Sequence, residues 1–241
     1  MAYTSRLLAA VPGIYHVFLN AAETASFDRA SLVDIKQVHG CDVLAYRAPP
    51  AERPVADGVF TDLAGQRLGI YTADCLPLLM ASRDGRFISS VHAGWRGAAA
   101  GIAQHAVAQF VARGVAAADI VVAIGPHIGA CCYEVSSAFY AQLLQTPAAE
   151  LARTRRQALL FSRPRRPTAL SPAAREMESQ WFSLADFCVM QLTRAGVAPE
   201  NIEVLDICTY CTPGEVLGSY RRRTHAPAEK TQQISWIAKT E

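Results

Sequence analysis

The sequence predicts a single α/β domain in which mixed β-sheets are flanked by helices. Three observations indicate this class. Residues 41–92 contain a series of short apolar runs separated by turn signals, residues 97–113 have helical periodicity, and no repeat or linker divides the chain. At ~150 residues per domain the length allows one or two domains. We expect one domain that spans residues 1–241.

The first half of the domain is predicted to be rich in strands. Turn-forming segments, Ala-Pro-Pro at 48–50 and Arg-Asp-Gly at 83–85, separate runs of residues that favour extended structure. We expect these strands at residues 41–47, 58–61, 67–72, 76–82 and 86–91.

The second half alternates helices and strands. The clearest helix covers residues 97–113, because Ala99, Ile102, Ala106 and Phe110 share one face and Gly114 follows as a stop signal. We also expect helices at 133–145 and 181–194, and strands at 119–124, 201–207 and 232–237. Residues 216–220 are strand-like, and the Pro- and Arg-rich segment 146–179 is predicted to be a mobile excursion.

Composition excludes several classes of protein. Hydrophobic residues make up 51% and charged residues 18%, so the chain can bury a sizeable core. A formal net charge of +2 argues against general nucleic-acid binding, which needs a concentrated basic surface. No run of 18 apolar residues or signal-peptide core occurs, so we expect neither a membrane span nor a secretory leader. The seven cysteines are then expected to be free thiols in a reducing cytoplasm.

Three local motifs carry residues suited to metal binding. They are Lys-Gln-Val-His-Gly at 36–40, Thr-Ala-Asp-Cys-Leu-Pro at 72–77 and Val-His-Ala-Gly-Trp-Arg-Gly at 91–97. Their His39, Cys75 and His92 lie at expected ends of strands, and imidazole and thiolate are the ligands that zinc prefers. Three protein ligands leave a fourth position open, which is the arrangement of catalytic zinc sites. We therefore predict a catalytic zinc site on these three residues.

Two neighbours of these ligands are predicted to take part in catalysis. Arg96 stands where strand gives way to helix and can bind a phosphate or carboxylate with its guanidinium group. Asp74 precedes the thiol and could move a proton or orient a ligand, although a turn or capping carboxylate is the alternative.

Three further residues are predicted to contact substrate. His127 is the best fourth candidate for the site, Cys132 lies in a motif typical of a pocket wall or core, and Arg221 is suited either to anion contact or to a salt bridge. Cys208 and Cys211 form a Cys-x-x-Cys, but no second such pair completes a zinc ribbon, so we expect structural thiols there.

Taken together, the motifs resemble those of the YfiH-type family, also called laccase-domain or polyphenol oxidase proteins. The likeness runs from about Gln37 to Ile237 and includes the segments 56–58, 124–135, 208–209 and 219–222. The resemblance implies a YfiH-like fold with zinc on His39, Cys75 and His92. It also implies purine nucleoside phosphorylase activity, with adenosine deamination and methylthioadenosine cleavage alongside.

The sequence departs from this family's pattern near its N-terminus. Relatives carry an Arg-containing segment well before the Gln-Val-His-Gly motif. Here Leu19-Asn20-Ala21 occupies that place, and only about half of the usual spacing precedes Gln37. The Arg expected near Ala21 is missing, and we expect its loss to weaken the binding of phosphate more than the binding of a neutral purine nucleoside.

Other functions remain open at this level. Cys75 and His92 could instead be the nucleophile and base of a cysteine hydrolase or deamidase. Some relatives have been linked to peptidoglycan precursor editing. A multicopper oxidase needs many histidines, and this chain has six with no His-x-His pair, so copper binding is expected to be adventitious. We expect a cytoplasmic zinc enzyme whose partners are a purine nucleoside and phosphate.

Overall fold

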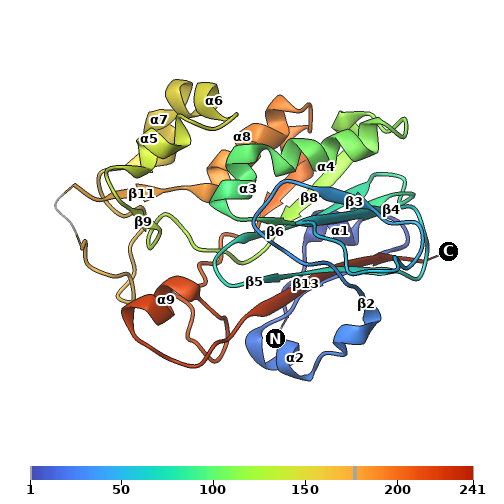
Figure 1. Cartoon of the computed structure of the whole chain (residues 1–241), viewed down its shortest axis with the longest axis horizontal. Coiled ribbons are helices and arrows are strands. Elements are labelled where there is room, and N and C mark those ends of the chain that lie inside the picture. Colours follow the sequence, from blue (N-terminus) through green and yellow to red (C-terminus); the bar gives the residue numbers. More distant parts are fainter. Residues whose placement is uncertain (1, 176–177, 241) are drawn as a thin grey trace.

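The computed structural model describes residues 2–175 and 178–240. Three layers are stacked in Figure 1: helices, a large sheet, and a smaller sheet beneath it. The large sheet has the strand order β12-β8-β6-β7-β4-β3, and the smaller sheet has the order β1-β13-β5-β2. Both sheets are mixed, because β12–β8, β3–β4 and β2–β5 are parallel pairs and the other pairs in these two sheets are antiparallel. The predicted fold class is confirmed.

The strands of the large sheet carry the site described below. In spatial order they are β12 (Ile202–Val204), β8 (Ile120–Ile124), β6 (Leu76–Ser82), β7 (Ile88–Ala93), β4 (Gly58–Thr61) and β3 (Val43–Ala45). The smaller sheet consists of β1 (Ile14–Phe18), β13 (Gln233–Lys239), β5 (Arg67–Thr72) and β2 (Leu32–Val33).

Strand β6 shows why the large sheet is covered on both faces. Its alternate residues Leu78 and Met80 pack in the cluster under the helices, whereas Leu79 and Ala81 pack in the cluster between the two sheets. Successive side chains of a strand point to opposite faces. A run that is apolar at every position therefore forms a strand buried on both sides, and all seven residues of β6 are buried.

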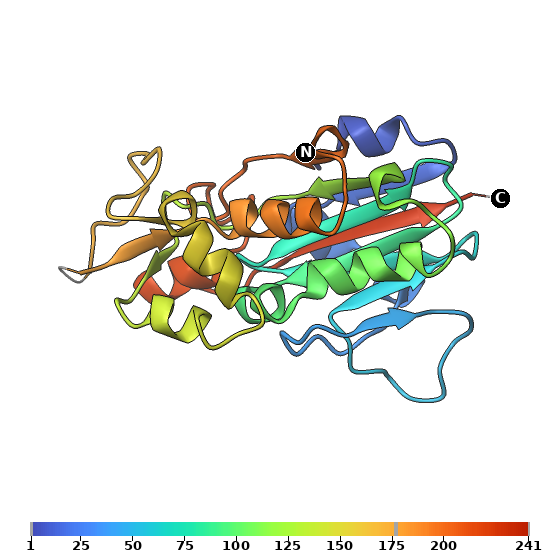
Figure 2. The ribbon, with the colours of Figure 1, turned by 90° about the horizontal axis from the view of Figure 1, so that it is seen from above.

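Helices α3 (Trp95–Ala100), α4 (Ile102–Val111) and α8 (Leu184–Arg194) cover the outer face of the large sheet. From above, α4 and α8 lie side by side over the strands (Figure 2). The single helix predicted at 97–113 is wrong in one respect: Gly101 has φ 97° and separates α3 from α4. This left-handed conformation suits glycine, which has no Cβ to clash.

The segment between β8 and α8 was predicted least well. Instead of a helix at 133–145, it contains β9 (Glu134–Val135) and the short α5 (Phe139–Leu143). Residues 146–161, predicted to be mobile, form α6 (Ala149–Thr154), α7 (Arg156–Leu159) and β10 (Leu160–Phe161). Leu151, Ala152 and Leu159 of this segment join the core, which explains its order. Residues 176–177 of the predicted excursion lie outside the described residues.

The remaining elements complete the framework. Strand β11 (Gln180–Phe182) joins β9 and β10 in a third, three-stranded sheet. The predicted strand-like segment 216–220 is wrong, because α9 (Tyr220–His225) begins there with Ser219 as its N-cap. Near the N-terminus lie α1 (Arg6–Ala9) and α2 (Ala21–Ser26). Within the described residues, no helix is long and apolar enough to cross a membrane.

Candidate metal centre and its surroundings

His39, Cys75 and His92 come together at one end of the central strands β6 and β7 of the large sheet. Cys75 immediately precedes β6 and His92 lies near the end of the antiparallel β7, so both lie at the same end of this strand pair. His39 reaches them from the loop between β2 and β3. One ligand atom from each of the three residues lies within 4.8 Å of the others, and the two imidazole rings meet edge to face with centroids 4.8 Å apart.

The buried carboxylate of Asp57 fixes both histidines. Its Oδ1 lies 2.7 Å from Nδ1 of His92 and accepts a hydrogen bond from the backbone N–H of His39. Its Oδ2 accepts from the N–H groups of Val38 and Gly40. Burial alone would raise the pKa of the Asp57 carboxyl, but the hydrogen bonds from His92, Val38 and Gly40 lower it below its usual value. An ionised Asp57 thus directs Nε2 of His92 toward the cluster.

The backbone around the cluster adopts uncommon conformations. His39 has φ 63° and Asp74 has φ 94°, which side-chain-bearing residues rarely adopt. Such conformations persist only where the surrounding structure holds them, and they gather at functional sites. Gly94 is required for a different reason: a Cβ there would lie 2.9 Å from Cδ2 of His39 and 3.0 Å from Sγ of Cys75.

The chemistry of the three side chains fits a divalent cation. Burial, followed by the neighbouring His92, lowers the pKa of His39 and favours its neutral form, which can bind metal. Burial raises the pKa of the Cys75 thiol to about 12, and Asp74 and Asp57 raise it further in the same direction. A cation beside the sulfur would reverse this preference and favour the thiolate. The donor set consists of one sulfur and two imidazoles, one of which is oriented by the Asp57 carboxylate, and it therefore fits a metal ion.

Asp74 lies next to this cluster but directs its carboxylate away from solvent. Its Oδ1 accepts a hydrogen bond of 2.6 Å from the Thr209 hydroxyl, and its Oδ2 accepts one of 2.6 Å from the backbone N–H of Arg221. Burial raises the pKa of the carboxyl above its usual value. Asp74 thus connects the start of β6 to the segments that carry Thr209 and Arg221.

Arg96 and Tyr133 border the same region. The Arg96 side chain is exposed and its guanidinium group lies 4.8 Å from the ring centroid of Trp95. Burial raises the pKa of the Tyr133 phenol, with charges on Cys75, Arg221, Asp74 and Arg96 also acting on it. Tyr133 therefore stays protonated at neutral pH and can donate a hydrogen bond.

Arg221 lines a small cavity of about 280 Å³ together with Glu134, Arg175 and His225. Its guanidinium group donates to the backbone oxygen of Glu134 at 2.7 Å and lies 5.4 Å from the centroid of the Tyr133 ring. The N–H of Arg221 is bonded to Asp74, so this cavity is linked directly to the region of Cys75.

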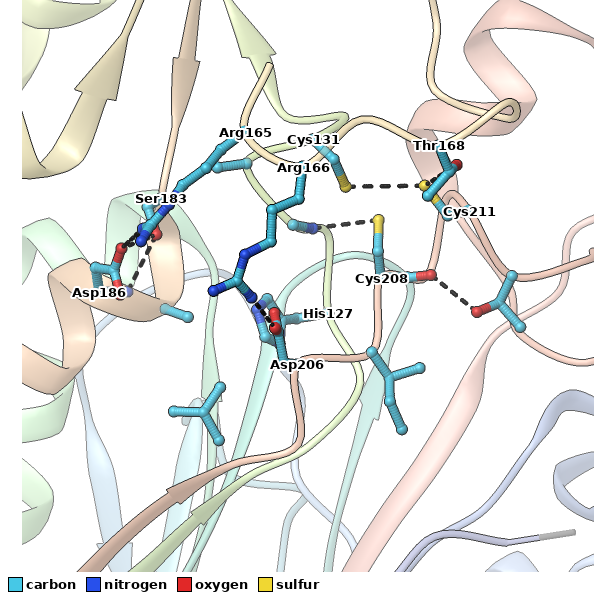
Figure 3. Close-up of a pocket in the computed structure, with 16 residues that line it drawn as sticks. His127, Cys131, Arg165, Arg166, Thr168, Ser183, Asp186, Asp206, Cys208 and Cys211 are labelled. Carbon is cyan, nitrogen blue, oxygen red and sulfur yellow. Dashed lines mark hydrogen bonds and ion pairs between the residues drawn. The ribbon is translucent and has the colours of Figure 1, made fainter. Parts of the chain in front are cut away.

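His127 lines a second, larger cavity of about 650 Å³ (Figure 3). The imidazole is buried, and burial lowers its pKa, so the ring is neutral at physiological pH. Nδ1–H then donates to the Gly125 oxygen at 2.8 Å, which leaves Nε2 as an acceptor. The same cavity is bordered by the ion pairs Arg165–Asp186 and Arg166–Asp206.

Cys132, predicted to contact substrate, lies among other cysteines in the interior. Its side chain is fully buried, and its Sγ lies 3.2 Å from Sγ of Cys211. Cys131 and Cys208 complete a group of four thiols, named the four-cysteine cluster below. A contact between Cys132 and substrate remains a prediction.

Sequence reasoning missed Asp57, Tyr133 and Glu134 as residues of the site. Asp57 stands in Ala-Asp-Gly just before the fully buried β4, within a segment that contributes to the family resemblance but that does not by itself indicate a role for the carboxylate. Tyr133 and Glu134 were hidden inside a predicted helix. The carboxyl of Glu134 in fact accepts a hydrogen bond of 2.7 Å from the N–H of Arg175 at the small cavity.

A mixed α/β fold with a His/Cys/His group at the ends of two central strands defines a candidate metalloenzyme, and comparison with known proteins assigns the chain to a family. The model of the family described as multi-copper polyphenol oxidoreductase laccase matches residues 16–238. The chain belongs to this family.

Relatives in this family carry the name purine nucleoside phosphorylase. The chain is 32% identical to purine nucleoside phosphorylase slr1573 of Synechocystis over 84% of its own length and 76% of that protein. It is 33% identical to purine nucleoside phosphorylase YlmD of Geobacillus stearothermophilus over 79% of its length and 67% of that protein.

Solved structures share the fold. The crystal structure of YlmD from Geobacillus stearothermophilus has a TM-score of 0.73 at 24% identity and covers 98% of this chain and 94% of that one. The Neisseria meningitidis protein NMB0706 has a TM-score of 0.75 at 18% identity, over 100% and 99% of the two chains.

Proposed function

We propose that this protein is a zinc-dependent purine nucleoside phosphorylase that acts on adenosine, inosine and methylthioadenosine and also deaminates adenosine. The observation that carries the proposal is the convergence of His39, Cys75 and His92 within 4.8 Å of one another. The names of the relatives support the reaction class.

Zinc is favoured by the type and number of ligands. One thiolate and two imidazoles are a preferred zinc donor set, and three protein ligands leave a position for substrate or water. Asp57 holds His92 by its Nδ1 at 2.7 Å, so the Nε2 atom is the one left to bind metal. A zinc ion held there would supply Lewis acidity and would acidify a water molecule at the site.

Phosphorolysis places specific demands on the surrounding side chains. A phosphate oxygen must form a bond to C1′ of the ribose while the bond from C1′ to the purine nitrogen breaks, and the phosphate proton ends on the departing base. Arg96 is proposed to bind the phosphate dianion, because its guanidinium group is exposed and its positive charge acts on His39 and Tyr133. The Tyr133 hydroxyl is proposed to donate a hydrogen bond to substrate.

Arg221 and His127 are proposed as substrate-binding residues, and Cys132 as a residue that supports the substrate site without touching substrate. Arg221 adds positive charge at the small cavity beside Asp74. The free Nε2 of His127 offers an acceptor in the larger cavity, whose volume of about 650 Å³ is in the range of small-molecule sites. Cys132 would act from behind the cavity wall, since its side chain is fully buried.

Asp74 is proposed to act in proton transfer and in positioning. Its two carboxylate oxygens hold Thr209 and the Arg221 backbone beside Cys75. To carry a proton to or from substrate, the carboxyl has to exchange one of these hydrogen bonds for one to the substrate.

The decisive experiment is a nucleoside panel on metal-quantified protein, with and without phosphate. Adenosine, inosine and methylthioadenosine should give ribose 1-phosphate or its methylthio analogue only when phosphate is present. Adenosine should also give inosine without phosphate. Copper content and phenol oxidation are measured on the same sample, and phenol turnover that depends on copper alone would contradict the proposal.

A cysteine hydrolase is the second candidate, and one observation favours it. Cys75, His92 and Asp57 form a thiol–imidazole–carboxylate series with the His92–Asp57 contact at 2.7 Å, as a nucleophile, base and orienting group require. His39 has no role in such a series, which favours the metal centre. Removing metal by chelation separates the two: the zinc enzyme loses its activity and regains it with zinc, whereas the hydrolase stays active and its Cys75 is alkylated rapidly.

A further inference from the structure

The four-cysteine cluster is built from two loops that lie at the same end of the large sheet. Cys131 and Cys132 follow β8, and Cys208 and Cys211 follow β12, the parallel neighbour of β8. The backbone joins the two loops directly, because the N–H of His127 donates to the oxygen of Ile207 and the N–H of Thr209 donates to the oxygen of His127. The four thiols are therefore brought together by fixed backbone.

The spacing of the sulfur atoms matches the size of one metal ion. The four Sγ atoms all lie within 4.8 Å of one another, with 3.8 Å between Cys131 and Cys211 and 3.2 Å between Cys132 and Cys211. Four thiolates around a tetrahedral zinc at ~2.3 Å have sulfur atoms ~3.8 Å apart. Both measured distances exceed the ~2.05 Å of a disulfide, and all seven cysteines, which lie within the described ranges, are free.

Hydrogen-bond donors already surround the sulfur atoms. The N–H of Gly129 donates to Sγ of Cys208 at 3.3 Å, and the hydroxyl of Thr168 donates to Sγ of Cys211 at 3.2 Å. Donors of this kind stabilise thiolates and orient them, as the outer contacts of a metal centre do.

We propose that Cys131, Cys132, Cys208 and Cys211 bind one zinc ion at a closed, structural site distinct from the His39, Cys75 and His92 centre. A set of four thiolates fills a tetrahedron and leaves no position for substrate, so the role is structural. Burial of Cys131 and Cys132 fits this role. The larger cavity, which Cys131, Cys208 and Cys211 border, gives the ion a path from solvent (Figure 3).

The ion would hold together the parts of the chain that surround Asp74. Tyr133 and Glu134 directly follow Cys131 and Cys132, and Thr209, which donates to Asp74, directly follows Cys208. Without the ion, these two loops are joined mainly by the bridge between His127 and Cys208. Loss of the ion should therefore loosen the loops on one side of the proposed active site.

The experiment counts zinc in full-length protein purified and saturated with zinc under reducing conditions. Wild-type protein should hold about two zinc ions per chain, and C211S and the double variant C208S/C211S should each hold about one. Cys188, a fully buried thiol in α8, serves as a matched control, and C188S should retain about two. C75A should also lose about one ion, but from the His39, Cys75 and His92 centre. The zinc content of the variants therefore shows separately whether each of the two metal sites is assigned correctly.

Cobalt substitution in the C75A variant supplies a readout that does not depend on the stability of the cluster variants. Cobalt bound to four thiolates gives intense sulfur-to-cobalt charge-transfer absorption and a tetrahedral visible spectrum, and zinc should displace it. Absence of this spectrum, zinc content that is unchanged in C208S/C211S, or a disulfide within the cluster under reducing conditions would each overturn the proposal.

Discussion

Nδ1 of His92 lies 2.7 Å from Oδ1 of Asp57, a carboxylate with no exposed surface. This contact determines which nitrogen of His92 is available to bind a metal ion. Asp57 also accepts hydrogen bonds from three backbone N–H groups, at residues 38–40, and these bonds fix the position of His39. The geometry of two proposed ligands therefore depends on one residue that would not touch the metal.

We expect Asp57→Asn to weaken zinc binding at this centre by about 10- to 100-fold, the usual effect of removing such an outer contact. Asparagine keeps an oxygen for the backbone amides but loses the charge that fixes the His92 tautomer. Competition with a chromophoric chelator measures the affinity. Asp84→Asn, at a surface carboxylate, is the control, and equal zinc affinity in the two variants would contradict the role given to Asp57.

Gly94→Ala should disturb the same centre by steric contact alone. The new Cβ would lie 2.9 Å from Cδ2 of His39, closer than such atoms approach, and in a tight contact of 3.0 Å with Sγ of Cys75. Metal–ligand distances tolerate only about 0.2 Å of error, so we expect at least about tenfold weaker zinc binding. Gly214→Ala, whose Cβ would meet the side chain of Arg222 at 3.4 Å, should bind zinc normally. Normal affinity in both variants would show that the ligands can shift freely.

Arg96→Ala should raise the phosphate KM by roughly 10- to 100-fold, since a charge-assisted hydrogen bond contributes about 1.5–3 kcal/mol. The nucleoside KM should change much less. The assay titrates phosphate at fixed inosine and follows ribose 1-phosphate against free ribose. Arg194→Ala, at a surface ion pair on α8, is the control. Tight phosphate saturation that survives Arg96→Ala would place the anion elsewhere.

Glu203 gives a prediction about stability and pH. Its carboxylate accepts hydrogen bonds from the Ser5 hydroxyl at 2.7 Å and the Leu7 N–H at 3.0 Å. Burial alone would raise the pKa of Glu203, but these two bonds, together with Arg6, lower it below its ordinary value. The stabilisation is thus fully present above the ordinary pKa and is lost as pH falls through the lower, folded-state pKa.

Glu203→Gln should accordingly reduce the free energy of unfolding by about 1–3 kcal/mol at pH 7. The difference from wild type should shrink as the pH is lowered toward about 3. Urea denaturation across this pH range measures it, with the exposed Glu200→Gln as control. A difference that is constant with pH would show that the charge of Glu203 does not matter.

The fold was predictable where pattern alone decides structure. Strands β4, β5 and β6 coincide with the predicted 58–61, 67–72 and 76–82, because continuous apolar or β-branched runs between turns have few alternatives. The helix predicted at 133–145 failed because its apolar residues are divided between β9 and α5, a choice made by pairing with β11. Strand pairing between distant residues leaves no local signal.

The candidate site was predictable in its three ligand types but not in its supporting residues. His39, Cys75 and His92 stand in distinctive motifs, whereas the importance of Asp57 depends on three amides and an imidazole that approach it only in the folded chain. The four-cysteine cluster was missed for a related reason. The partner of the Cys-x-x-Cys is not a second Cys-x-x-Cys but the adjacent pair Cys131 and Cys132, which is separated from Cys211 by 79 or more positions in the sequence.

The place of β13 in the smaller sheet has a consequence for biosynthesis. This strand pairs with β1 on one side and β5 on the other, so residues 233–239 close a sheet that begins at residue 14. As the chain leaves the ribosome, β1 and β5 each have an unpaired edge until β13 has been synthesised. Pairing between strands that are far apart in the sequence, such as β1 and β13, is slow. Binding of chaperones to the nascent chain would be most useful during this interval, since exposed strand edges promote aggregation.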